Sequence, residues 1–280
     1  MATLICPSPA KLNLFLRIIG QREDSYHLLQ TIFQFIDFSD TLIFKKQVNS
    51  ILEIKGNINN VALEDNLIYK AAVLLKDFTQ TRQGVSIEFH KKIPLGGGLG
   101  GGSSNAATVL LALNKLWELD LSLDELAQIG LTLGADVPVF IHGNAAWAEG
   151  IGEKLFDISL PEPWYIVIIP PCHVSTMKIF SNSQLTRDAT PCTIRVFNEE
   201  TSYNDCEPLV RKLYPQIDTA LNWLNQYTKA ILTGTGACIF GHFTELEKAK
   251  CVLNKIPAGF AGFIAKGINS SPLHHILGYR

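Results

Sequence analysis

The sequence predicts an α+β protein made of two closely packed domains. Strand patterns and helix patterns mix along the chain without the regular β-α-β alternation of a doubly wound parallel sheet. A chain of 280 residues is long enough for one large domain or two smaller ones. Prolines and a glycine interrupt the pattern over residues 151–163. We therefore expect an N-terminal domain over residues 1–155 and a C-terminal domain over residues 156–280.

Composition excludes several classes of protein. Hydrophobic residues make up 47% of the chain and charged residues only 18%. This balance excludes an intrinsically disordered protein, because a core of that size can offset the entropy lost on ordering. The net charge of -2 lacks the broad basic field that nucleic-acid binding needs, so we expect no nucleic-acid partner.

The cysteines and the apolar stretches indicate a cytoplasmic protein. The six cysteines are far apart, without the C-x-x-C pairs or Cys/His clusters of a zinc site, and we expect reduced thiols. Residues 1–10 do not have the pattern of a signal peptide. No apolar run approaches the roughly 18 residues that cross a bilayer, so we expect no membrane partner.

The first half begins with strands. Apolar residues alternate along Leu12–Ile18, which is the period of a strand with one apolar face. Short β-branched stretches predict further strands over 41–44 and 51–54. Residues 65–78 bring apolar side chains together at helical spacing, and Asp65 is the expected N-cap of this helix.

A glycine-rich passage interrupts the elements that follow. Val85–Phe89 predicts a strand, and it leads into residues 95–102, of which six are glycine. Ala106–Leu119 then has the composition of a helix. Ser122 and Glu125 form a capping-box signature, which predicts the start of another helix.

The second half combines short elements with weaker patterns. Thr244 and Glu247 repeat the capping-box signature. The expected elements are, in order, a strand over Tyr165–Ile169, a polar segment without a clear pattern over 181–203, a helix near 217–227, a strand–turn–strand unit over 230–240, a helix from Thr244 to about Asn254, and a final strand over 263–265.

Residues 94–107 carry the main functional signal. Glycines let the backbone approach an anion closely, and the helix that follows adds the positive end of its dipole. The pattern therefore predicts a phosphate-binding loop between a strand and a helix. A flexible linker is the competing interpretation, but a linker would not run directly into a helix with two serines in its first turn.

Three known kinds of phosphate loop fit this passage only in part. Gly96, Gly98 and Gly101 satisfy G-x-G-x-x-G, but no second strand ending in an acidic residue follows about 20 positions later. Residues 97–104 have the spacing of a P-loop, but Ser103 stands where the P-loop has its lysine. The H-R-D and D-F-G motifs of protein kinases are missing from the sequence.

Three motifs together resemble the GHMP kinase family. Residues 94–107 resemble the second motif of that family, Pro7–Leu14 resembles the first, and Leu232–Cys238 resembles the glycine-rich third motif. They occur in the family order. The resemblance implies a two-domain GHMP kinase fold, an active site in the cleft between the domains, and ATP as the co-substrate.

Further stretches resemble one branch of this family, whose substrate is CDP-methylerythritol. They are Ala10–Leu16, Tyr26–His27, Glu64–Leu67 and Gly134–Phe140, and the similarity is weakest over residues 181–203. The resemblance implies transfer of the γ-phosphate of ATP to the 2-hydroxyl of the erythritol moiety. It also implies small-molecule partners only, and a monomer or weak homodimer.

Asp136 and Lys11 are the candidate catalytic residues. Pro138 disfavours helix at Val137, so we expect the preceding helix to end around Asp136. On the residues alone, a surface carboxylate at a helix end competes with a catalytic role. The resemblance pairs Lys11 with Asp136, where the positive charge would keep the carboxylate ionised. Whether Asp136 removes the hydroxyl proton or orients the alcohol is left open by the sequence.

The resemblance also implies a set of ligand-binding residues. The triphosphate would lie on Pro94, Leu95, Gly96, Gly97, Gly98, Leu99, Gly100, Gly101, Gly102, Ser103 and Ser104, with Asn66 and Lys91 towards the adenine. Mg²⁺ would be held through ATP and water with a hydroxyl from Ser103 or Ser104, and we expect no separate protein metal site.

For the cytidine end, the resemblance implies stacking and edge recognition. Tyr26 and Phe180 would stack on the base, His27 would bond to its polar edge, and Asn13 would lie near the phosphates or polyol. Half-buried core aromatics are the competing interpretation of the two rings. The family commonly has glycine where Ser25 stands, and serine adds strain if this position requires positive φ.

A second glycine-rich turn is formed by Gly234, Thr235 and Gly236. It would support the phosphate loop or the substrate diphosphate, and a plain hairpin turn is the alternative. Three other functions compete with the main expectation. They are another small-alcohol kinase of the same family, a dinucleotide-dependent oxidoreductase and a non-catalytic nucleotide-binding regulator.

Overall fold

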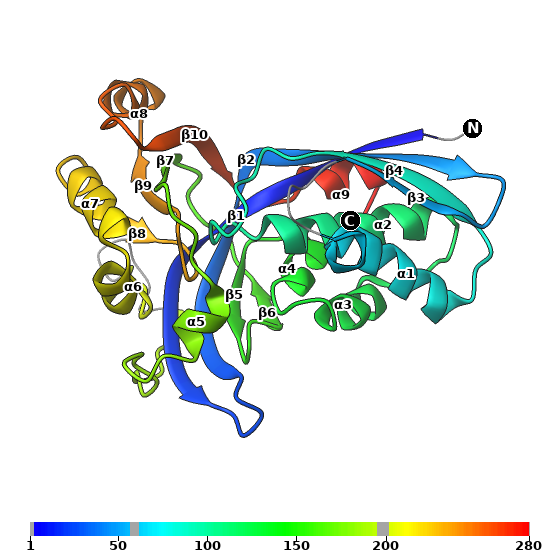
Figure 1. Ribbon diagram of the computed structural model, residues 1–280, viewed down its shortest axis with the longest axis horizontal. Coiled ribbons are helices and arrows are strands. Elements are labelled where there is room, and N and C mark those ends of the chain that lie inside the picture. The colour runs from blue at the N-terminus through cyan, green and yellow to red at the C-terminus, as the bar shows by residue number, and fades with distance from the viewer. Residues whose placement is uncertain (1–2, 57–61, 195–201, 280) are drawn as a thin grey trace.

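The computed structural model describes residues 3–56, 62–194 and 202–279. A long antiparallel hairpin of β1 (Thr3–Gln21) and β2 (His27–Gln47) runs through the molecule (Figure 1). Both strands are longer than the sequence predicted. Residues 8–11, which precede the predicted strand, are buried without alternation, and a strand buried on both faces need not show a period-2 signal.

The hairpin joins a ten-stranded sheet in the described part of the chain. The sheet path is β3-β4-β2-β10-β7-β9-β8, with β1 and β5 also on β2 and β6 on β5. Among these named pairs only β3 and β4 are parallel, which excludes a doubly wound parallel sheet. The strands are β3 (Leu52–Lys55), β4 (Gly84–His90), β5 (Ala146–Glu149), β6 (Lys154–Asp157), β7 (Trp164–Ile169), β8 (Ile231–Leu232), β9 (Ile239–Phe243) and β10 (Ala261–Ile268).

The helices gather at the two ends of the molecule (Figure 1). The first group is η1 (Leu63–Asp65), α1 (Leu67–Thr79), α2 (Gly101–Leu116), α3 (Leu123–Leu131) and α4 (Val137–His142). The second group is α5 (Thr176–Phe180), α6 (Glu207–Leu213), α7 (Pro215–Leu224) and α8 (Leu246–Leu253). The mixture of helices with a mostly antiparallel sheet confirms the predicted α+β class.

Three clusters of buried side chains hold these elements together. One surrounds α2 and a second lies among α6, α7 and β7. The third joins the two halves, because it combines Leu12 of β1 and Leu99 of the glycine loop with Val167, Cys238 and Phe240 of the second half. The glycine loop is therefore anchored where the halves meet.

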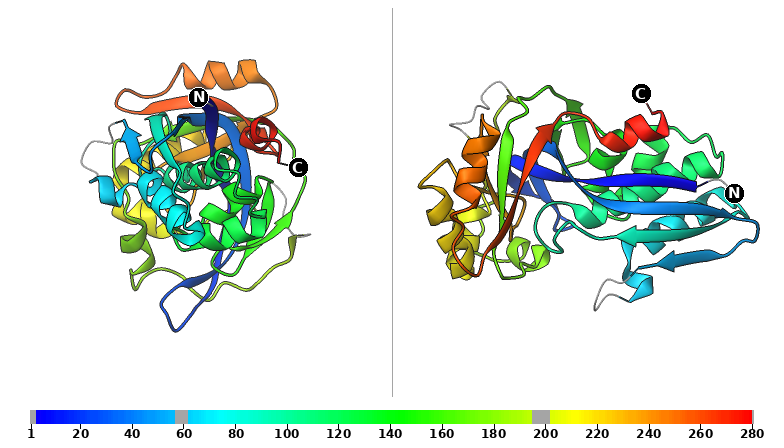
Figure 2. Two further views of the ribbon diagram at one scale, coloured as in Figure 1. Left: turned by 90° about the vertical axis from the view of Figure 1, so that its right-hand side faces the viewer. Right: turned by 90° about the horizontal axis from the view of Figure 1, so that it is seen from above.

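The last helix, α9 (Pro272–Leu277), returns to the first half of the chain (Figure 2). Its Leu273 and Leu277 belong to the core around α2. The predicted boundary at residue 155 falls within β6, and the division into residues 1–155 and 156–280 stays a prediction. None of the helices in the described ranges is long and apolar enough to cross a bilayer.

The helix starts test the capping predictions. Ser122 and Glu125 form the predicted capping box at α3. The prediction for Asp65 was wrong. That residue lies inside the η1 turn, and Asn66, whose backbone is extended as an N-cap requires, accepts from the Ile68 N–H at 2.9 Å.

Two other predictions at helix starts were also wrong. Glu245, not Thr244, has the extended backbone of the N-cap of α8, so Glu247 lies one position too early to complete a capping box. Val137 is helical. The preceding helix ends at Leu131, and Pro138 lies in the first turn of α4, where its missing N–H needs no partner.

Candidate active site

Lys11 is the central charged group of the site. It is 3% exposed, and its Nζ lies 3.2 Å from Asp136 Oδ2 and 3.2 Å from the Gly98 carbonyl oxygen, and it also donates to Asn13 Oδ1. An ammonium has three donors, so these acceptors use all of them. The predicted contact with Asp136 is thus present, and the same side chain ties β1 to the glycine loop.

Asn13 lies on β1 at a shift in register with β2. The shift falls between Asn13 and Phe15, and such an irregularity redirects side chains locally. The Asn13 N–H donates to Thr233 Oγ1 at 3.0 Å, and its Nδ2 donates to Thr31 Oγ1 at 2.9 Å. Asn13 is therefore fixed through both its backbone and its side chain.

The glycine loop has a backbone that other residues would strain. Gly96, Gly98 and Gly100 all have positive φ, between 64° and 74°. A Cβ at Gly98 would lie 2.1 Å from the Thr233 carbonyl oxygen. The loop therefore packs directly on a second segment of backbone, and this packing excludes the flexible-linker interpretation.

That second segment is the turn between β8 and β9. The N–H groups of Ala237 and Cys238 each donate at 3.1 Å, to the carbonyls of Gly96 and Gly97. Thr233 Oγ1 donates to the Gly98 carbonyl at 3.2 Å. The turn that contains Gly234, Thr235 and Gly236 is thus both a hairpin turn and a support for the glycine loop. Thr235 Oγ1 also contacts Thr176 Oγ1 at 2.9 Å.

Helix α2 begins inside the glycine run, at Gly101 rather than at the predicted Ala106. Ser104 is fully buried and accepts from Ser8 Oγ at 2.8 Å. Ser103 is partly exposed, and a Cβ at Gly134 would lie 3.7 Å from its Oγ. Of the two predicted hydroxyls, Ser103 therefore faces the segment that carries Asp136.

A buried network of charged and polar groups around Asp40 supports the residues on both sides of the glycine loop. Asp40 is fully buried, and its carboxylate accepts from Lys91 Nζ, from Asn105 Nδ2 at 2.9 Å, and from the N–H groups of Lys92 and Ile93 at 2.7 and 2.9 Å. Lys91 Nζ also donates to Asn105 Oδ1 at 2.9 Å. The network joins the interior of β2 to the residues on both sides of the glycine loop.

Asp40, Asn105, Ser8 and Thr233 were missed by the sequence analysis. Thr233 lies inside the third motif and could have been singled out there. Ser8 and Asn105 lie inside the first and second motifs, but their bonding partners are up to 97 residues away, and Asp40 lies outside all three motifs. Asn66 and Lys91 were predicted near the adenine; Asn66 caps α1, and the Lys91 ammonium is bonded to Asp40 and Asn105.

The residues predicted to hold the cytidine lie near the turn of the β1–β2 hairpin and on α5. The rings of His27 and Phe180 are 4.8 Å apart between centroids and tilted by 32°, so the structure brings these two residues together. Tyr26 beside them is 56% exposed. Ser25 has a φ of 70°, which confirms that this position requires the conformation that glycine favours.

Burial lowers the pKa of His27, and the nearby Arg187 guanidinium lowers it further. Arg187 was not predicted as a site residue, because it lies in the stretch where the sequence resemblance is weakest. Its Nε donates to His27 Nε2 at 2.9 Å.

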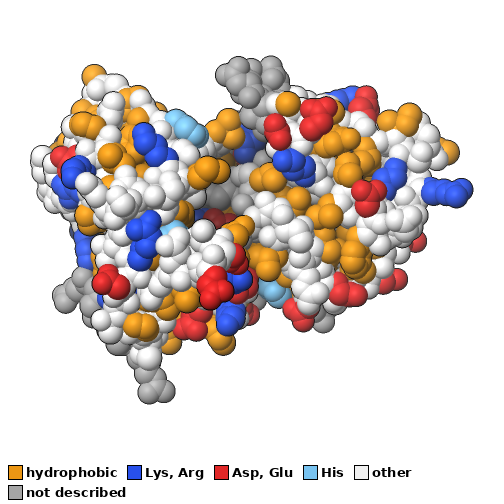
Figure 3. Space-filling view, turned by 60° about the horizontal axis from the view of Figure 1, so that its bottom comes forward, with side chains coloured by type: hydrophobic (Ala, Val, Ile, Leu, Met, Phe, Trp, Pro, Cys, Tyr) orange, Lys and Arg blue, Asp and Glu red, His pale blue; other side chains and the backbone are white. Residues whose placement is uncertain are grey.

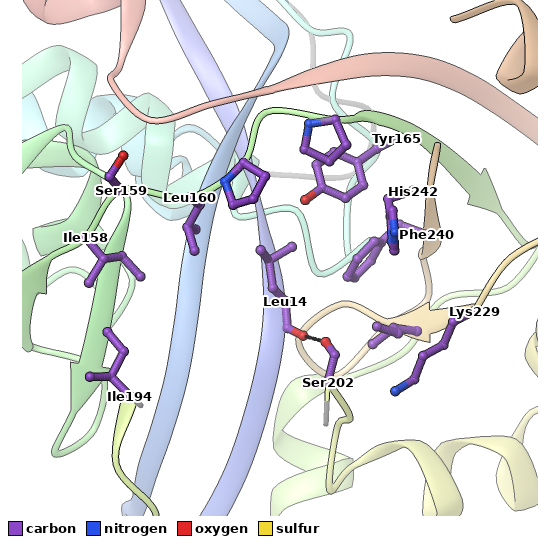
Figure 4. A pocket seen from close by; sticks show the side chains of 13 residues that line it. Leu14, Ile158, Ser159, Leu160, Tyr165, Ile194, Ser202, Lys229, Phe240 and His242 are labelled. Carbon is purple, nitrogen blue, oxygen red and sulfur yellow. Dashed lines mark hydrogen bonds between the residues drawn. The ribbon is translucent and has the colours of Figure 1, made fainter. Parts of the chain in front are cut away.

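Two concave features mark the surface. The space-filling view shows the molecule hollowed between its two halves (Figure 3). A pocket of about 410 Å³ is lined by Leu14, Ile158, Leu160, Tyr165, Phe240 and other side chains, mostly apolar (Figure 4). Its described lining includes none of the predicted site residues. Leu14 faces it, whereas the neighbouring Asn13 bonds to Thr31 and Thr233.

Two family models match the chain. The model of the GHMP kinases N terminal domain matches residues 66–144, and that of the GHMP kinases C terminal matches residues 194–262. The chain belongs to the GHMP kinase family. A GHMP kinase uses ATP as its co-substrate, so the glycine loop of this kinase belongs to an ATP-dependent enzyme.

Curated relatives of this kinase share one name. The chain is 50% identical over 271 residues to the 4-diphosphocytidyl-2-C-methyl-D-erythritol kinase of Tolumonas auensis, a match that covers 97% of this chain and 95% of the relative. It is 52% identical over 279 residues to the protein of the same name from Marinobacter nauticus, with 98% and 97% covered.

Solved structures agree with these relatives. A crystal structure of 4-(cytidine 5'-diphospho)-2C-methyl-D-erythritol kinase matches with a TM-score of 0.83 at 30% identity, covering 94% of this chain and 99% of that chain. A mevalonate kinase from Methanococcus jannaschii matches with a TM-score of 0.71 at 18% identity, covering 96% and 99%. The second similarity shows the fold alone.

Proposed function

We propose that this protein transfers the γ-phosphate of ATP to the 2-hydroxyl of 4-diphosphocytidyl-2-C-methyl-D-erythritol. It is then a phosphotransferase with an alcohol acceptor, in the non-mevalonate pathway to isoprenoid precursors. The relatives that carry this activity in their names support the substrate. The observation that carries the chemistry is the Lys11 ammonium, which contacts both Asp136 and the glycine loop.

The glycine loop would hold the triphosphate. Phosphoryl transfer needs the donor and acceptor in line and the charge on the transferring oxygens neutralised. The six glycines at 96–98 and 100–102 would let backbone N–H groups approach a ligand without a side chain of their own, and α2 directs the positive end of its dipole at the same point. Because the loop carbonyls are held by Lys11, Thr233 and the β8–β9 turn, the loop need not reorganise when the phosphates bind.

Asp136 is the group that would accept the hydroxyl proton. Its side chain is 35% exposed, so an alcohol can reach it, whereas the Lys11 side chain is 3% exposed. The Lys11 ammonium fixes the carboxylate and provides the positive charge beside the reacting groups. Asn13, held by Thr31 and Thr233, would then orient the polyol or the phosphates.

Mg²⁺ would reach the site together with ATP. The described residues include no group of three or more His, Cys, Asp or Glu side chains that could form a metal site of its own. The residues present fit an ion held mainly by phosphate oxygens and water, since Ser103 offers a partly exposed hydroxyl. The ion supplies positive charge that offsets the charge on the phosphates.

The remaining ligand contacts are those that the family resemblance implies. Asn66 and Lys91 would lie towards the adenine, and Tyr26, His27 and Phe180 would hold the cytidine. We propose that the enzyme works in the cytoplasm as a monomer or weak homodimer. Sedimentation velocity tests the last point, and a stable higher oligomer at micromolar protein would contradict it.

The decisive experiment is ADP release from Mg-ATP by the purified protein. We expect turnover with 4-diphosphocytidyl-2-C-methyl-D-erythritol and none with mevalonate, homoserine or galactose. Asp136→Asn is expected to lower kcat by about 10²- to 10⁴-fold. Asp124→Asn is the matched control, since Asp124 is an 85% exposed carboxylate on α3, and we expect no loss of activity.

The other outcomes identify the competing functions. Turnover with a different alcohol would indicate another small-alcohol kinase of the family. ATP binding without ADP release from any substrate would indicate a regulator, and NAD(P) binding without ATP turnover would indicate an oxidoreductase.

A further inference from the structure

Arg187 is bonded to two residues of the proposed cytidine site, His27 and Phe180. It lies beyond α5 in a segment without regular secondary structure. Its Nε donates to His27 Nε2 at 2.9 Å, and its Nη2 donates to the Phe180 carbonyl at 2.8 Å. The same guanidinium also donates to the carbonyls of Asn182 at 2.8 Å and Leu185 at 3.0 Å. One side chain therefore fixes the His27 ring and, through the Phe180 carbonyl, the backbone that carries Phe180.

These contacts determine where the His27 ring carries its proton. An arginine has donors only, so the His27 nitrogen that faces it must be an acceptor. In a neutral imidazole the other nitrogen then carries the hydrogen. His27 is consequently the Nδ1–H tautomer, and Nδ1–H is the donor that remains for a ligand.

The charges around His27 keep its ring neutral. Burial lowers the pKa of His27, and Arg187 lowers it further. Arg187 is the charged group that approaches from the second half of the chain. In the preceding turn, Arg22 and Asp24 pair with each other at 2.7 Å, and the residue opposite His27 on β1 is the neutral Gln21. No carboxylate is in contact with the ring among these neighbours.

We propose that Arg187 is a positioning residue that sets the base specificity of the site by fixing His27 as an Nδ1–H donor. The proposal rests on the proposed function, because it concerns how the cytidine substrate is recognised. Cytosine presents two adjacent acceptors, N3 and O2. Uracil carries a hydrogen on N3, so a donor directed at N3 accepts cytosine and rejects uracil. A site built around one hydrogen bond can discriminate strongly against the analogue that cannot form it.

The first test measures the tautomer directly. Long-range ¹H–¹⁵N correlation spectra of the wild-type protein without ligand, assigned with His27→Gln, report which imidazole nitrogen is protonated. We expect Nδ1 to carry the hydrogen and Nε2 to be bare. A protonated Nε2 at neutral pH would overturn the proposal, and this result needs neither turnover nor an arginine variant.

The second test removes the guanidinium. Arg187→Met is expected to raise KM for the cytidyl substrate by about 10- to 100-fold while kcat and KM for ATP stay within about twofold. Preference for the cytidyl over the uridyl substrate should fall by about tenfold or more. The acid limb of kcat/KM for the cytidyl substrate should move to higher pH, because loss of Arg187 raises the pKa of His27.

Two controls separate positioning from folding. Arg211→Met removes another arginine with several partners, Glu207, Asp218 and Asn222, and should leave KM for the cytidyl substrate and the base preference unchanged. Arg187→Lys keeps a donor and a positive charge and should recover part of the preference. Equal loss of preference in Arg187→Met and Arg187→Lys would overturn the proposal, as would unchanged preference in Arg187→Met.

These tests distinguish the inference from the proposed function. If the wild-type enzyme turns over the cytidyl substrate but His27 carries its proton on Nε2, only the inference fails. If the wild-type enzyme does not turn over the cytidyl substrate, the proposed function fails. Calorimetry with CDP and UDP then decides the inference, since equal affinities would overturn it and a preference for CDP that Arg187→Met abolishes would support it.

Discussion

The two parts of the molecule that we propose to bind the phosphates and the cytidine, called here the phosphate end and the cytidine end, are built differently. At the phosphate end, Lys11 is buried, Asp40 and Ser104 are fully buried, and the glycine loop bonds through its carbonyls to a second turn. At the cytidine end, Tyr26 is 56% exposed, and His27 is held by one guanidinium from a segment about 160 residues away in sequence. The phosphate end is held by hydrogen bonds from several elements, whereas the cytidine end depends on few contacts.

The difference follows from what each end must do. Charge stabilisation in phosphoryl transfer requires groups that are already in place before the reaction. Base recognition requires that the cytosine ring of the substrate can enter its binding site. A closed network of hydrogen bonds would prevent this entry. Substitutions at the phosphate end should therefore reduce both catalysis and stability, whereas those at the cytidine end should change substrate affinity first.

Loss of the central ammonium should have the largest effect. Lys11→Met leaves Asp136, Asn13 and the Gly98 carbonyl without their shared donor, and we expect kcat to fall by about 10³-fold. Steady-state kinetics measure the change. Lys115→Met is the control, because both ammonium groups lie over an aromatic ring, Lys11 at 5.2 Å from the Phe33 centroid and Lys115 at 4.3 Å from the Tyr279 centroid, and Lys115 has no predicted role. A fall in kcat of less than tenfold for Lys11→Met would contradict the central role of this ammonium at the phosphate end.

The buried network beneath the loop should come next. Asp40→Asn leaves the Lys91 charge without its carboxylate, and we expect the free energy of unfolding to fall by about 3 kcal/mol. Urea denaturation measures this quantity, and KM for ATP should rise in the same variant. Glu53→Gln removes an exposed carboxylate paired with Lys55 at 3.1 Å and should leave the free energy of unfolding nearly unchanged. Similar losses in both variants would contradict the account.

Packing of the glycine loop gives a third, smaller effect. Gly98→Ala places a Cβ 2.1 Å from the Thr233 carbonyl oxygen at a φ of 74°, so we expect a loss of about 2 kcal/mol together with weaker ATP binding. Gly259 has a φ of 92° and nothing within 4 Å of an added Cβ. Gly259→Ala should therefore lose only about 1 kcal/mol and retain its affinity for ATP. Urea unfolding and ATP titrations of both variants measure these effects. Equal stability and equal ATP affinity in Gly98→Ala and Gly259→Ala would show that the loop relaxes around the added Cβ.

The smallest expected effect is at the cytidine end. Ser25→Gly relieves a φ of 70° and should stabilise the protein by up to about 1 kcal/mol. Gln80→Gly relieves a φ of 53° at the end of α1 and is the matched control. Only Ser25→Gly should also change KM for the cytidyl substrate. A change of KM in both variants, or in neither, would remove the link between this turn and substrate binding.

The two ends also differ in how well the sequence predicted them. The phosphate loop was recognised because its glycines form one continuous run between a strand and a helix. Ser25 was recognised as a position of positive φ because it stands where the family commonly has glycine. Asp40 was missed, since its four donors come from residues 91 to 105 and a single buried aspartate has no local signature. Arg187 was missed because it lies where the resemblance is weakest and its partner His27 is 160 residues away in sequence.

The fold shows the same limit. The bounds of α1 and the start of α3 were predicted within a few residues, because apolar spacing and a capping box are local signals. The first part of β2 and the short strands β5 and β6 were missed. β1 lost its alternation where both faces are buried, and β5 and β6 depend on pairing with β2, which only the folded chain provides.

Phosphorus NMR of the reaction product tests the central claim most directly. The wild-type protein, Mg-ATP and 4-diphosphocytidyl-2-C-methyl-D-erythritol should give ADP and one new phosphomonoester, located at the 2-hydroxyl by its carbon–phosphorus couplings, with the diphosphate bridge intact. Lys11→Met and Asp136→Asn should give almost none in the same time. A phosphomonoester at another hydroxyl would contradict the account. So would as much product from either variant as from the wild-type protein.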